Sequence, residues 1–242
     1  MKLIKMALVA LSLMAVPLGA NAQELSDARV KELVYEAIRE NPEIVMEAVA
    51  ILQARQAKDE ASAAQDVLSS QRQLLERDPN APVLGNPEGD VTIVEFFDYN
   101  CPYCKRAAPE VKALVAADPN VRLVFREWPI LGEGSVYAAR AALASRNQGK
   151  YEEFHDAMMG LKGRATEQSV LRVAAEIGMD IEKMTADMGS DEVAEHIETS
   201  MRLTQALGVT GTPAFVIGDA IIPGFIELPQ LQKLVDDTRA AN

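Results

Sequence analysis

Two cysteines separated by two residues, Cys101 and Cys104, constrain this chain more than any other feature. They are the only cysteines in 242 residues, and they follow closely a run of β-branched and aromatic residues, 91–97 (VTIVEFF), that is typical of a strand. From Cys101 to about residue 117 the apolar residues recur with helical spacing, so the pair lies where a strand gives way to a helix. A disulfide across so short a loop removes little entropy from the unfolded chain and would stabilise the fold little. The pair therefore indicates chemistry rather than a structural crosslink.

The position of the pair at a helix start predicts which thiol attacks the substrate and which resolves the mixed disulfide. Thiolate is the nucleophile in disulfide exchange, and the free N–H groups and positive dipole end of a helix N-terminus favour it. We therefore expect Cys101 to be the attacking, partly exposed thiol and Cys104 to resolve the mixed disulfide. Pro102 stiffens the first helical turn, and Lys105 and Arg106 add positive charge nearby.

Resident metals and cofactors are not indicated by this sequence, and we expect the redox-active disulfide Cys101–Cys104 to be the only reactive group. A zinc site needs more ligands than the cysteine pair provides, and the two histidines, His155 and His196, are expected to be surface or hydrogen-bonded helix residues. The adjacent methionines at 158–159 predict core packing. Two thiolates can hold Cu(I), so a Cu(I)-handling envelope protein stays as an alternative.

Glu95 stands in the middle of the apolar strand, six residues before Cys101. A carboxylate is costly to bury unless it has a partner or a task. We interpret Glu95 as a buried proton acceptor for Cys104. An acid at the exposed end of the strand, or one paired with a lysine or arginine, is the alternative.

A second special position is Thr212-Pro213, which precedes a later strand. A proline at a strand start removes one donor of the sheet and fits only particular places. An X-Pro bond can be cis, which would expose the Thr212 backbone for pairing with an extended substrate. The spacing is equally consistent with an ordinary trans turn.

The order of the expected elements predicts an α/β fold, a thioredoxin-like sheet with a helical insertion and a preceding helical extension. The first strand, the cysteine helix and a second strand make a right-handed βαβ unit with parallel strands. The insertion at about 134–208 holds only helical stretches punctuated by glycines. The expected strands are 91–97, 121–128, 213–217 and 220–223, and a last helix runs from about 228 to 238.

The first 22 residues have the composition of a secretory signal peptide. Lys2 and Lys5 precede an apolar stretch that ends near Leu18, and residues 20–22 (ANA) form a small-x-small cleavage site. The stretch is too short to span a bilayer comfortably, since spanning needs ~20 apolar residues. We expect a soluble protein of the periplasm. Its net charge falls from −12 to −14 without the two lysines, which argues against nucleic acid as a partner.

Residues 23–80 predict a helical extension in front of a redox domain at 81–242. Apolar residues at 30–38 and 44–52 form helical faces, and Asn41-Pro42 interrupts them. Such faces must be buried against something. The stretch from Ala50 to Leu75 keeps a 4-3 spacing mostly with alanine, which is a poor core, and we interpret it as a spacer.

The segments EFFDYNCPYC and GVTGTPAF, with the helical insertion between them, resemble the DsbA-like thiol–disulfide oxidoreductases of the thioredoxin superfamily over roughly residues 80–240. The resemblance implies disulfide exchange in exported cysteine-containing proteins and a membrane redox partner. It implies that Cys101 and Cys104 are the redox pair, that the bond before Pro213 is cis and that Glu95 is buried behind the active site. The residues that we expect at the substrate surface are Pro102, Tyr103, Thr212 and Pro213.

The extension is similar to that of the suppressor-of-copper-sensitivity (ScsC-like) branch, whose members oligomerise through it and act as isomerases. The resemblance implies a homo-oligomer, a trimer rather than a dimer, with disulfide isomerase activity; a monomeric disulfide oxidase is the alternative. The best-known oxidase of the family has histidine where this chain has Tyr103. We therefore expect Cys101 to be less acidic, and the disulfide less oxidising, than in that oxidase. A holdase or scaffold with a vestigial pair is a third class.

Overall fold

The computed structural model describes residues 26–241, and the expected signal peptide at 1–22 lies outside them. None of the described helices is long and apolar enough to cross a membrane. The elements are α1 (Asp27–Glu40), α2 (Glu43–Arg77), β1 (Val83–Gly85), β2 (Val91–Phe97), α3 (Pro102–Ala117), β3 (Val121–Glu127), α4 (Glu133–Ser145), the 3₁₀ turn η1 (Arg146–Gln148), α5 (Tyr151–Met159), α6 (Glu167–Glu176), α7 (Ile181–Asp187), α8 (Asp191–Ala206), β4 (Ala214–Ile217), β5 (Ala220–Pro223) and α9 (Leu228–Ala241).

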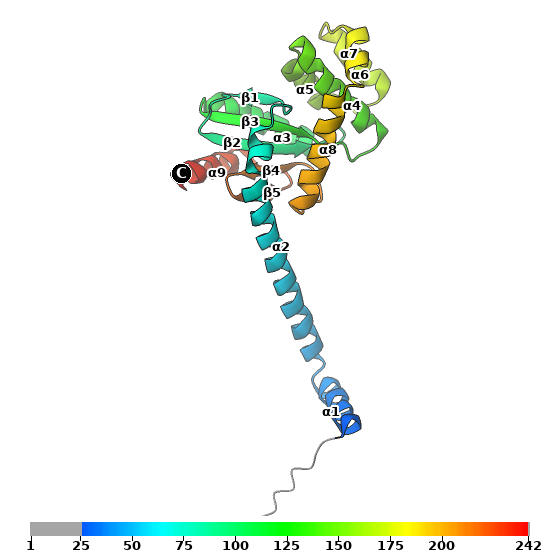
Figure 1. The fold of residues 1–242 in the computed structure, drawn as a ribbon, viewed down its shortest axis with the longest axis vertical. Helices are drawn as coiled ribbons and strands as arrows, with labels where there is room; N and C mark the ends of the chain where they lie inside the picture. Colours follow the sequence, from blue (N-terminus) through cyan, green and yellow to red (C-terminus); the bar gives the residue numbers. More distant parts are fainter. Residues whose placement is uncertain (1–25, 242) are drawn as a thin grey trace, which may run out of the picture. The chain divides into compact units, whose positions relative to one another are not determined.

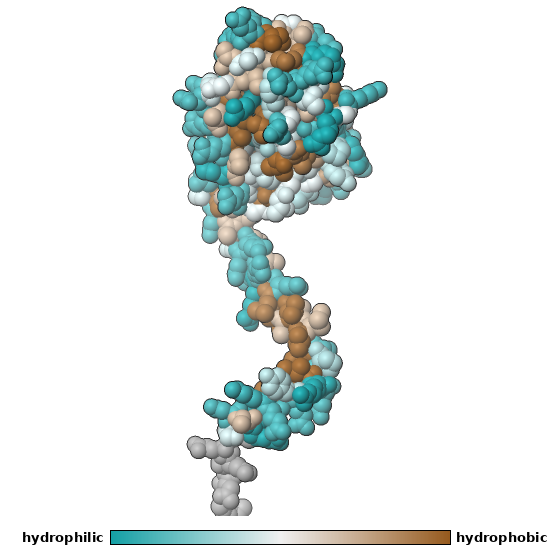
Figure 2. Space-filling model, turned by 90° about the vertical axis from the view of Figure 1, so that its right-hand side faces the viewer, coloured by the Kyte–Doolittle hydropathy of each residue, from teal (hydrophilic) through white to brown (hydrophobic). Residues whose placement is uncertain are grey.

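Contacts divide the chain into two compact units, one ending at Arg55 and one beginning at Gln56, so the division falls within α2. In the first unit, the side chain of Ser26 accepts a hydrogen bond from the N–H of Arg29 and caps α1. The predicted interruption at Asn41-Pro42 is confirmed, because α1 ends at Glu40 and α2 begins at Glu43. No residue of α1 is buried. Figure 2 shows apolar surface along this helical segment, and its exposed members are Val30, Leu33, Val34, Tyr35, Ile44, Val45, Met46, Val49, Ile51 and Leu52.

The second unit is built on a five-stranded sheet with the order β1-β3-β2-β4-β5 (Figure 1). Strands β2 and β3 are parallel, as the expected βαβ unit requires, and β4 and β5 pair antiparallel next to β2. Helices α4 to α8 fill the chain between β3 and β4, which confirms the α/β class with a helical insertion. Strand β1, which pairs antiparallel with β3, was not expected. It has three residues, too few for a strand pattern to show.

The two central strands are buried on both faces, and their side chains alternate between two cores. Ile93, Phe97 and Phe125 belong to the core beneath α3, α5 and α9. Val94 and Phe96 belong to the opposite core. Odd-numbered positions of β2 and β3 therefore face α3, and even-numbered positions face the other layer.

The C-terminal half of α2 supplies that other layer. Leu68 and Leu75 are each only 1% exposed and pack with Val124 and Leu203. Arg126 of β3, whose side chain is fully buried, donates to the Leu74 carbonyl and pairs with Asp78 at 2.7 Å. These bonds hold the end of α2, where helix carbonyls lack partners within the helix. The stretch from Ala50 to Leu75 that we interpreted as a spacer is therefore part of the compact second unit from Gln56 onward.

The insertion helices bury their own apolar side chains and both histidines. Met158 is fully buried and Met159 nearly so, as predicted for core residues. His196 accepts a hydrogen bond from the backbone N–H of Glu127 at 3.1 Å, and its Nδ1 lies 3.1 Å from the Asn80 carbonyl oxygen. Of the two expectations for the histidines, exposed or hydrogen-bonded, the structure shows the second.

Candidate active site

The cysteine pair lies at the start of α3, directly after the turn that follows β2 (Figure 1). Cys101 is the N-cap residue, with extended backbone angles of φ −78° and ψ 118°, and Pro102 begins the helix. The expected strand-to-helix position is therefore confirmed. Cys101 is only 4% exposed, so the expectation of a partly exposed thiol was wrong. The Thr212 carbonyl oxygen lies 3.1 Å from Cys101 Sγ and accepts the hydrogen bond of the protonated thiol.

The two thiols have opposite acidities. The pKa of Cys101 is lowered from 9.0 to about 5. The largest cause is the hydrogen bond that the neighbouring Cys104 thiol makes to the Cys101 thiolate. Burial opposes this lowering, while the Thr212 side chain and the backbone N–H groups of Cys104 and Tyr103 at the helix start lower the pKa further. Burial raises the pKa of Cys104 far above 9.0, and the hydrogen bond with Cys101 and the charge of Glu95 act in the same direction. The geometry thus favours one thiolate and one thiol.

Glu95 is 2% exposed in the middle of β2, on the sheet face that carries α3. Its Oε1 has no hydrogen-bond partner among the described residues. Burial raises the pKa of Glu95 from 4.5 to about 8, and the charge of the Cys101 thiolate contributes to this rise. The alternative of an exposed or ion-paired acid is therefore wrong, and the carboxyl can hold or release a proton near neutral pH.

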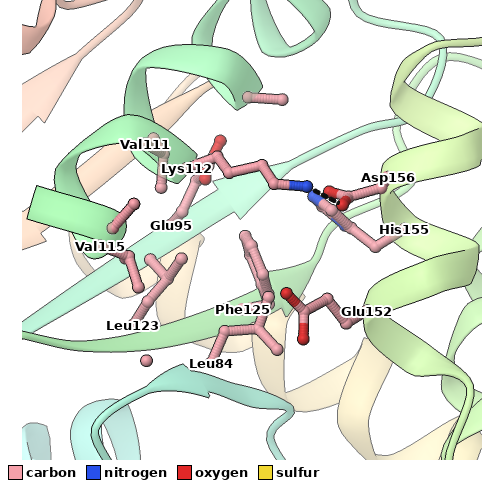
Figure 3. A pocket seen from close by; sticks show the side chains of 13 residues that line it. Leu84, Glu95, Val111, Lys112, Val115, Leu123, Phe125, Glu152, His155 and Asp156 are labelled. Atoms are coloured by element: carbon pink, nitrogen blue, oxygen red, sulfur yellow. Dashed lines mark hydrogen bonds and ion pairs between the residues drawn. The ribbon is translucent and has the colours of Figure 1, made fainter. Parts of the chain in front are cut away.

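A pocket of about 220 Å³ lies behind the cysteine helix and reaches Glu95. Figure 3 shows Glu95 entering it from β2, Lys112 from α3, and His155 and Asp156 from α5. Lys112 forms an ion pair with Asp156 at this site. The remaining lining is mainly apolar, with Phe125 on the sheet. The carboxyl of Glu95 is therefore buried but contacts a space large enough for water.

The four residues expected at the substrate surface are placed as follows. Pro102 and Tyr103 are exposed, Tyr103 to 54%. The Thr212–Pro213 peptide bond is cis, as the resemblance implied. Pro213 itself is buried, and its carbonyl accepts a hydrogen bond from the N–H of Gly224 at 2.8 Å, so it does not lie at the surface as expected. Thr212 is half-buried and its carbonyl contacts Cys101, so the loop before β4 and the start of α3 meet at the reactive sulfur.

Asp98, in the turn before the pair, organises a neighbouring loop. Its carboxylate accepts hydrogen bonds from the N–H groups of Ile130 and Leu131 at 2.8 and 2.9 Å, from the N–H of Asn100 at 2.7 Å and from Ser135 Oγ at 2.7 Å. Ile130 and Leu131 are 42% and 36% exposed. Two apolar side chains are therefore held at the surface by the same turn that leads into Cys101.

The two basic residues of α3 make local contacts. Lys105 Nζ donates to the carbonyls of Leu161 and Gly163 at 2.7 and 2.9 Å, which ties the loop after α5 to the cysteine helix. The guanidinium of Arg106 lies over the ring of Phe225 at 4.3 Å. Their positive charges are thus engaged in these contacts.

A buried polar cluster beside the site was missed by the sequence reasoning. Glu127, 1% exposed at the end of β3, accepts hydrogen bonds from Tyr151 at 2.8 Å and from Tyr99 at 3.3 Å. Tyr99 Oη also lies 3.2 Å from His155 Nδ1. Burial raises the pKa of Glu127 well above 4.5. The two-residue periodicity of a strand indicates a buried position for Glu127, because Glu127 lies on the same face as the apolar Phe125.

Comparisons with known proteins agree with this geometry. A family model described as a DSBA-like thioredoxin domain matches residues 92–236, and one described as the copper resistance protein ScsC N-terminal domain matches residues 28–58. The chain is also 31% identical over 137 residues to the Na⁺/H⁺ antiporter NhaA 3 of Salinispora tropica, over 56% of this chain and 21% of the antiporter. The chain spans only about a fifth to a quarter of the length of the curated antiporters that it matches.

Two solved structures are similar over most of the chain. A thioredoxin-like oxidoreductase from Silicibacter pomeroyi DSS-3 is 65% identical with a TM-score of 0.70, covering 71% of this chain and 99% of that one. A linker-deletion mutant of Proteus mirabilis ScsC is 27% identical with a TM-score of 0.68, covering 93% of this chain and 100% of that one. With a family model that matches more than half of its length, this chain belongs to the DSBA-like thioredoxin-domain family.

Proposed function

We propose that the protein is a thiol–disulfide oxidoreductase of the bacterial periplasm that exchanges disulfides in exported cysteine-containing proteins. The observation that carries this proposal is the placement of the pair: Cys101 is the N-cap residue of α3, and Cys104 is buried further along the same helix. In keeping with it, the pKa of Cys101 is lowered to about 5 and that of Cys104 is raised above its ordinary 9.0. Disulfide exchange needs one thiolate that attacks the substrate and a second thiol that stays protonated until it resolves the mixed disulfide. A structural disulfide needs neither.

The reaction follows from these positions. In the isomerase direction, the Cys101 thiolate attacks a sulfur of a substrate disulfide and forms a mixed disulfide, while the other substrate sulfur leaves as a thiolate. That substrate thiolate attacks a different disulfide of the same substrate, and a final thiolate displaces Cys101. If no substrate thiolate displaces Cys101, Cys104 gives its proton to Glu95 and attacks Cys101 Sγ. This attack forms the Cys101–Cys104 disulfide and releases the substrate as a thiolate. Glu95 lies on the correct sheet face, and with a pKa of about 8 the fraction of it that is ionised near neutral pH is a base that can accept that proton.

Substrate recognition in this proposal uses the surface around Cys101. The exposed Pro102 and Tyr103 lie on one side, and the backbone of the half-buried Thr212 lies on another, where it can pair with an extended substrate. Backbone pairing is independent of substrate sequence, which suits an enzyme that acts on many exported proteins. A membrane redox partner that resets the pair would need access to the same sulfur.

We further infer that the chain forms a homo-oligomer through residues 27–55, a trimer by family resemblance, and that it is a disulfide isomerase. The support is the row of exposed apolar side chains on α1 and the start of α2, none of which is buried in its own unit. A helix with such a face is stabilised by burying it. Several active sites on one assembly raise the effective concentration of thiolates around one misfolded substrate.

The test uses variants of the full mature chain. Val45→Lys together with Val49→Lys places charge on the apolar face of α2, and Glu47→Lys places the same residue on another face as the matched control. We expect the double variant to be monomeric by light scattering and to lose most of the refolding activity on scrambled ribonuclease, while Glu47→Lys keeps both. Cys101→Ser should abolish exchange in either background. A wild-type chain that is monomeric at micromolar concentration would leave a monomeric oxidase as the better function.

A further inference from the structure

The pocket behind the cysteine helix offers more room than a water molecule needs. Its volume is about 220 Å³, and it lies between α3, α5 and the sheet (Figure 3). In another protein, an apolar cavity of roughly 150 Å³ binds a molecule of benzene. The space next to Glu95 is larger than that cavity, so it can admit one aromatic ring together with a short polar group.

The buried walls of this pocket are mainly apolar. Val111 of α3 and Leu123 and Phe125 of β3 line it, and each is at most 3% exposed. Figure 3 shows these three side chains around the same space. Apolar surface that leaves water gains roughly 25 cal/mol per Å², so a ring that enters is stabilised by contact with these walls. The walls therefore favour a ligand with a compact apolar body.

Glu95 is the polar group among the buried walls. Its side chain is 2% exposed, and its Oε1 accepts no hydrogen bond from a described residue. Burial raises its pKa to about 8, because the charged carboxylate has lost its water. A ligand with a positive charge and an N–H donor would supply the two interactions that this carboxylate lacks.

The solvent side of the pocket carries excess negative charge. Glu152 and Lys112, which are exposed, and Asp156, which is half-exposed, line this side. Lys112 pairs with Asp156, so these two charges cancel. His155 is neutral at neutral pH, because burial lowers its pKa from 6.5 to about 4. The charges that remain are the carboxylates of Glu152 and of ionised Glu95, and both favour a cation.

We propose that this pocket binds a small organic cation, an amidinium or primary ammonium group carried on an apolar body of about one ring. The cationic group meets the carboxylate of Glu95, and the ring lies against the apolar walls. A planar amidinium can donate two parallel N–H groups to one carboxylate, as arginine does. This binding is non-covalent and separate from the proposed disulfide exchange, so either can fail without the other.

Benzamidine and benzamide are the matched probes, because they have nearly the same shape and only benzamidine is charged. The oxidised full mature chain is titrated with each at pH 8 in a calorimeter. The oxidised form has no Cys101 thiolate, whose charge would oppose the ionisation of Glu95. We expect one benzamidine to bind per chain and benzamide to bind about tenfold more weakly or not at all, because charge-assisted hydrogen bonds are the stronger ones. Equal affinities for the two probes would overturn the proposal.

Three charge variants locate the bound cation. Glu95→Gln keeps the size of the side chain and removes its charge, so it should weaken benzamidine binding about tenfold or more. Glu152→Gln and Glu153→Gln change two neighbouring exposed residues of α5, of which only Glu152 lines the pocket. We expect about two- to threefold weaker binding for Glu152→Gln and no change for Glu153→Gln. Equal losses in these two variants would indicate attraction by the overall charge of the protein and would overturn the site.

A second pair of variants tests the pocket while Glu95 stays in place. Ala108 and Ala113 are both half-buried on α3, and only Ala108 lines the pocket. The added atoms of Ala108→Leu occupy the space of the ring, so we expect this variant to lose benzamidine binding and Ala113→Leu to keep it. Benzamidine binding that is unchanged in either Glu95→Gln or Ala108→Leu would place the molecule elsewhere and overturn the proposal.

Discussion

The acidity of Cys101 should appear as a pH-dependent contribution to the stability of the reduced protein. The pKa of this thiol falls from 9.0 to about 5 in the folded state. A lowered pKa contributes stability that is complete above pH 9.0 and is lost as the pH falls through about 5. Each pH unit between these limits changes the free energy of unfolding by about 1.4 kcal/mol. From pH 5 to pH 7 the gain is therefore about 2 to 3 kcal/mol, with solvent screening of the thiolate favouring the lower value.

The measurement compares the reduced wild type with Cys101→Ser, which has no thiolate at this position. Urea unfolding under a reducing agent at pH 5, 6 and 7 gives the two free energies of unfolding, followed by emission of the single tryptophan, Trp128. The chosen window lies below the pKa of about 8 of Glu95, so that carboxyl stays protonated in it. The difference between the proteins should widen with pH. A constant difference from pH 5 to pH 7 would refute the reasoning.

Three further outcomes are expected. Brief iodoacetamide treatment of the reduced protein at neutral pH should label Cys101 and spare Cys104, and mass mapping that found the reverse would exchange their roles. Cys104→Ala should raise the pKa of Cys101 toward 9.0 in a thiolate absorbance titration, because the Cys104 thiol is the largest cause of the lowering; an unchanged titration contradicts this. Asp78→Asn should lower the free energy of unfolding by about 2–4 kcal/mol, since it leaves the buried Arg126 without its counter-charge. Glu198→Gln, in an exposed ion pair, is the control and should change it by less than about 0.5 kcal/mol; equal losses would contradict the assignment.

The sequence predicted those parts of the fold that have a strong local signal. The strand at 91–97, the interrupted helices on either side of Asn41-Pro42 and the strands after Pro213 all carry a clear pattern of apolar residues or a proline, and the structure has them. Strand β1 has only three residues and gains its order from pairing with β3, so no local pattern marks it. The roles of Cys101, Cys104 and Glu95 stay predictions, although the geometry around them is now described.

Long-range contacts account for what the sequence reasoning missed. The contact of Cys101 with Thr212 joins residues more than a hundred positions apart, and no spacing near the cysteines signals it. The end of α2 looked like a spacer because its own apolar residues are few, yet Arg126 of β3 and the Leu68 contact fix it to the sheet. Glu127 was missed although its alternation with Phe125 marks it as a core position, because its partners Tyr99 and Tyr151 are distant in the sequence.

The side chains of β3 alternate between two different cores, and this limits which insertions and deletions the gene can tolerate. Arg122 and Arg126 face the end of α2, while Phe125 and Glu127 face the cysteine helix, so one short segment carries two incompatible sets of side chains on its two sides. Deleting or inserting a single codon within it would exchange the two sets, turning arginines toward the reactive core and phenylalanine toward the helix end. Length variation among related genes should therefore be absent from positions 121–127.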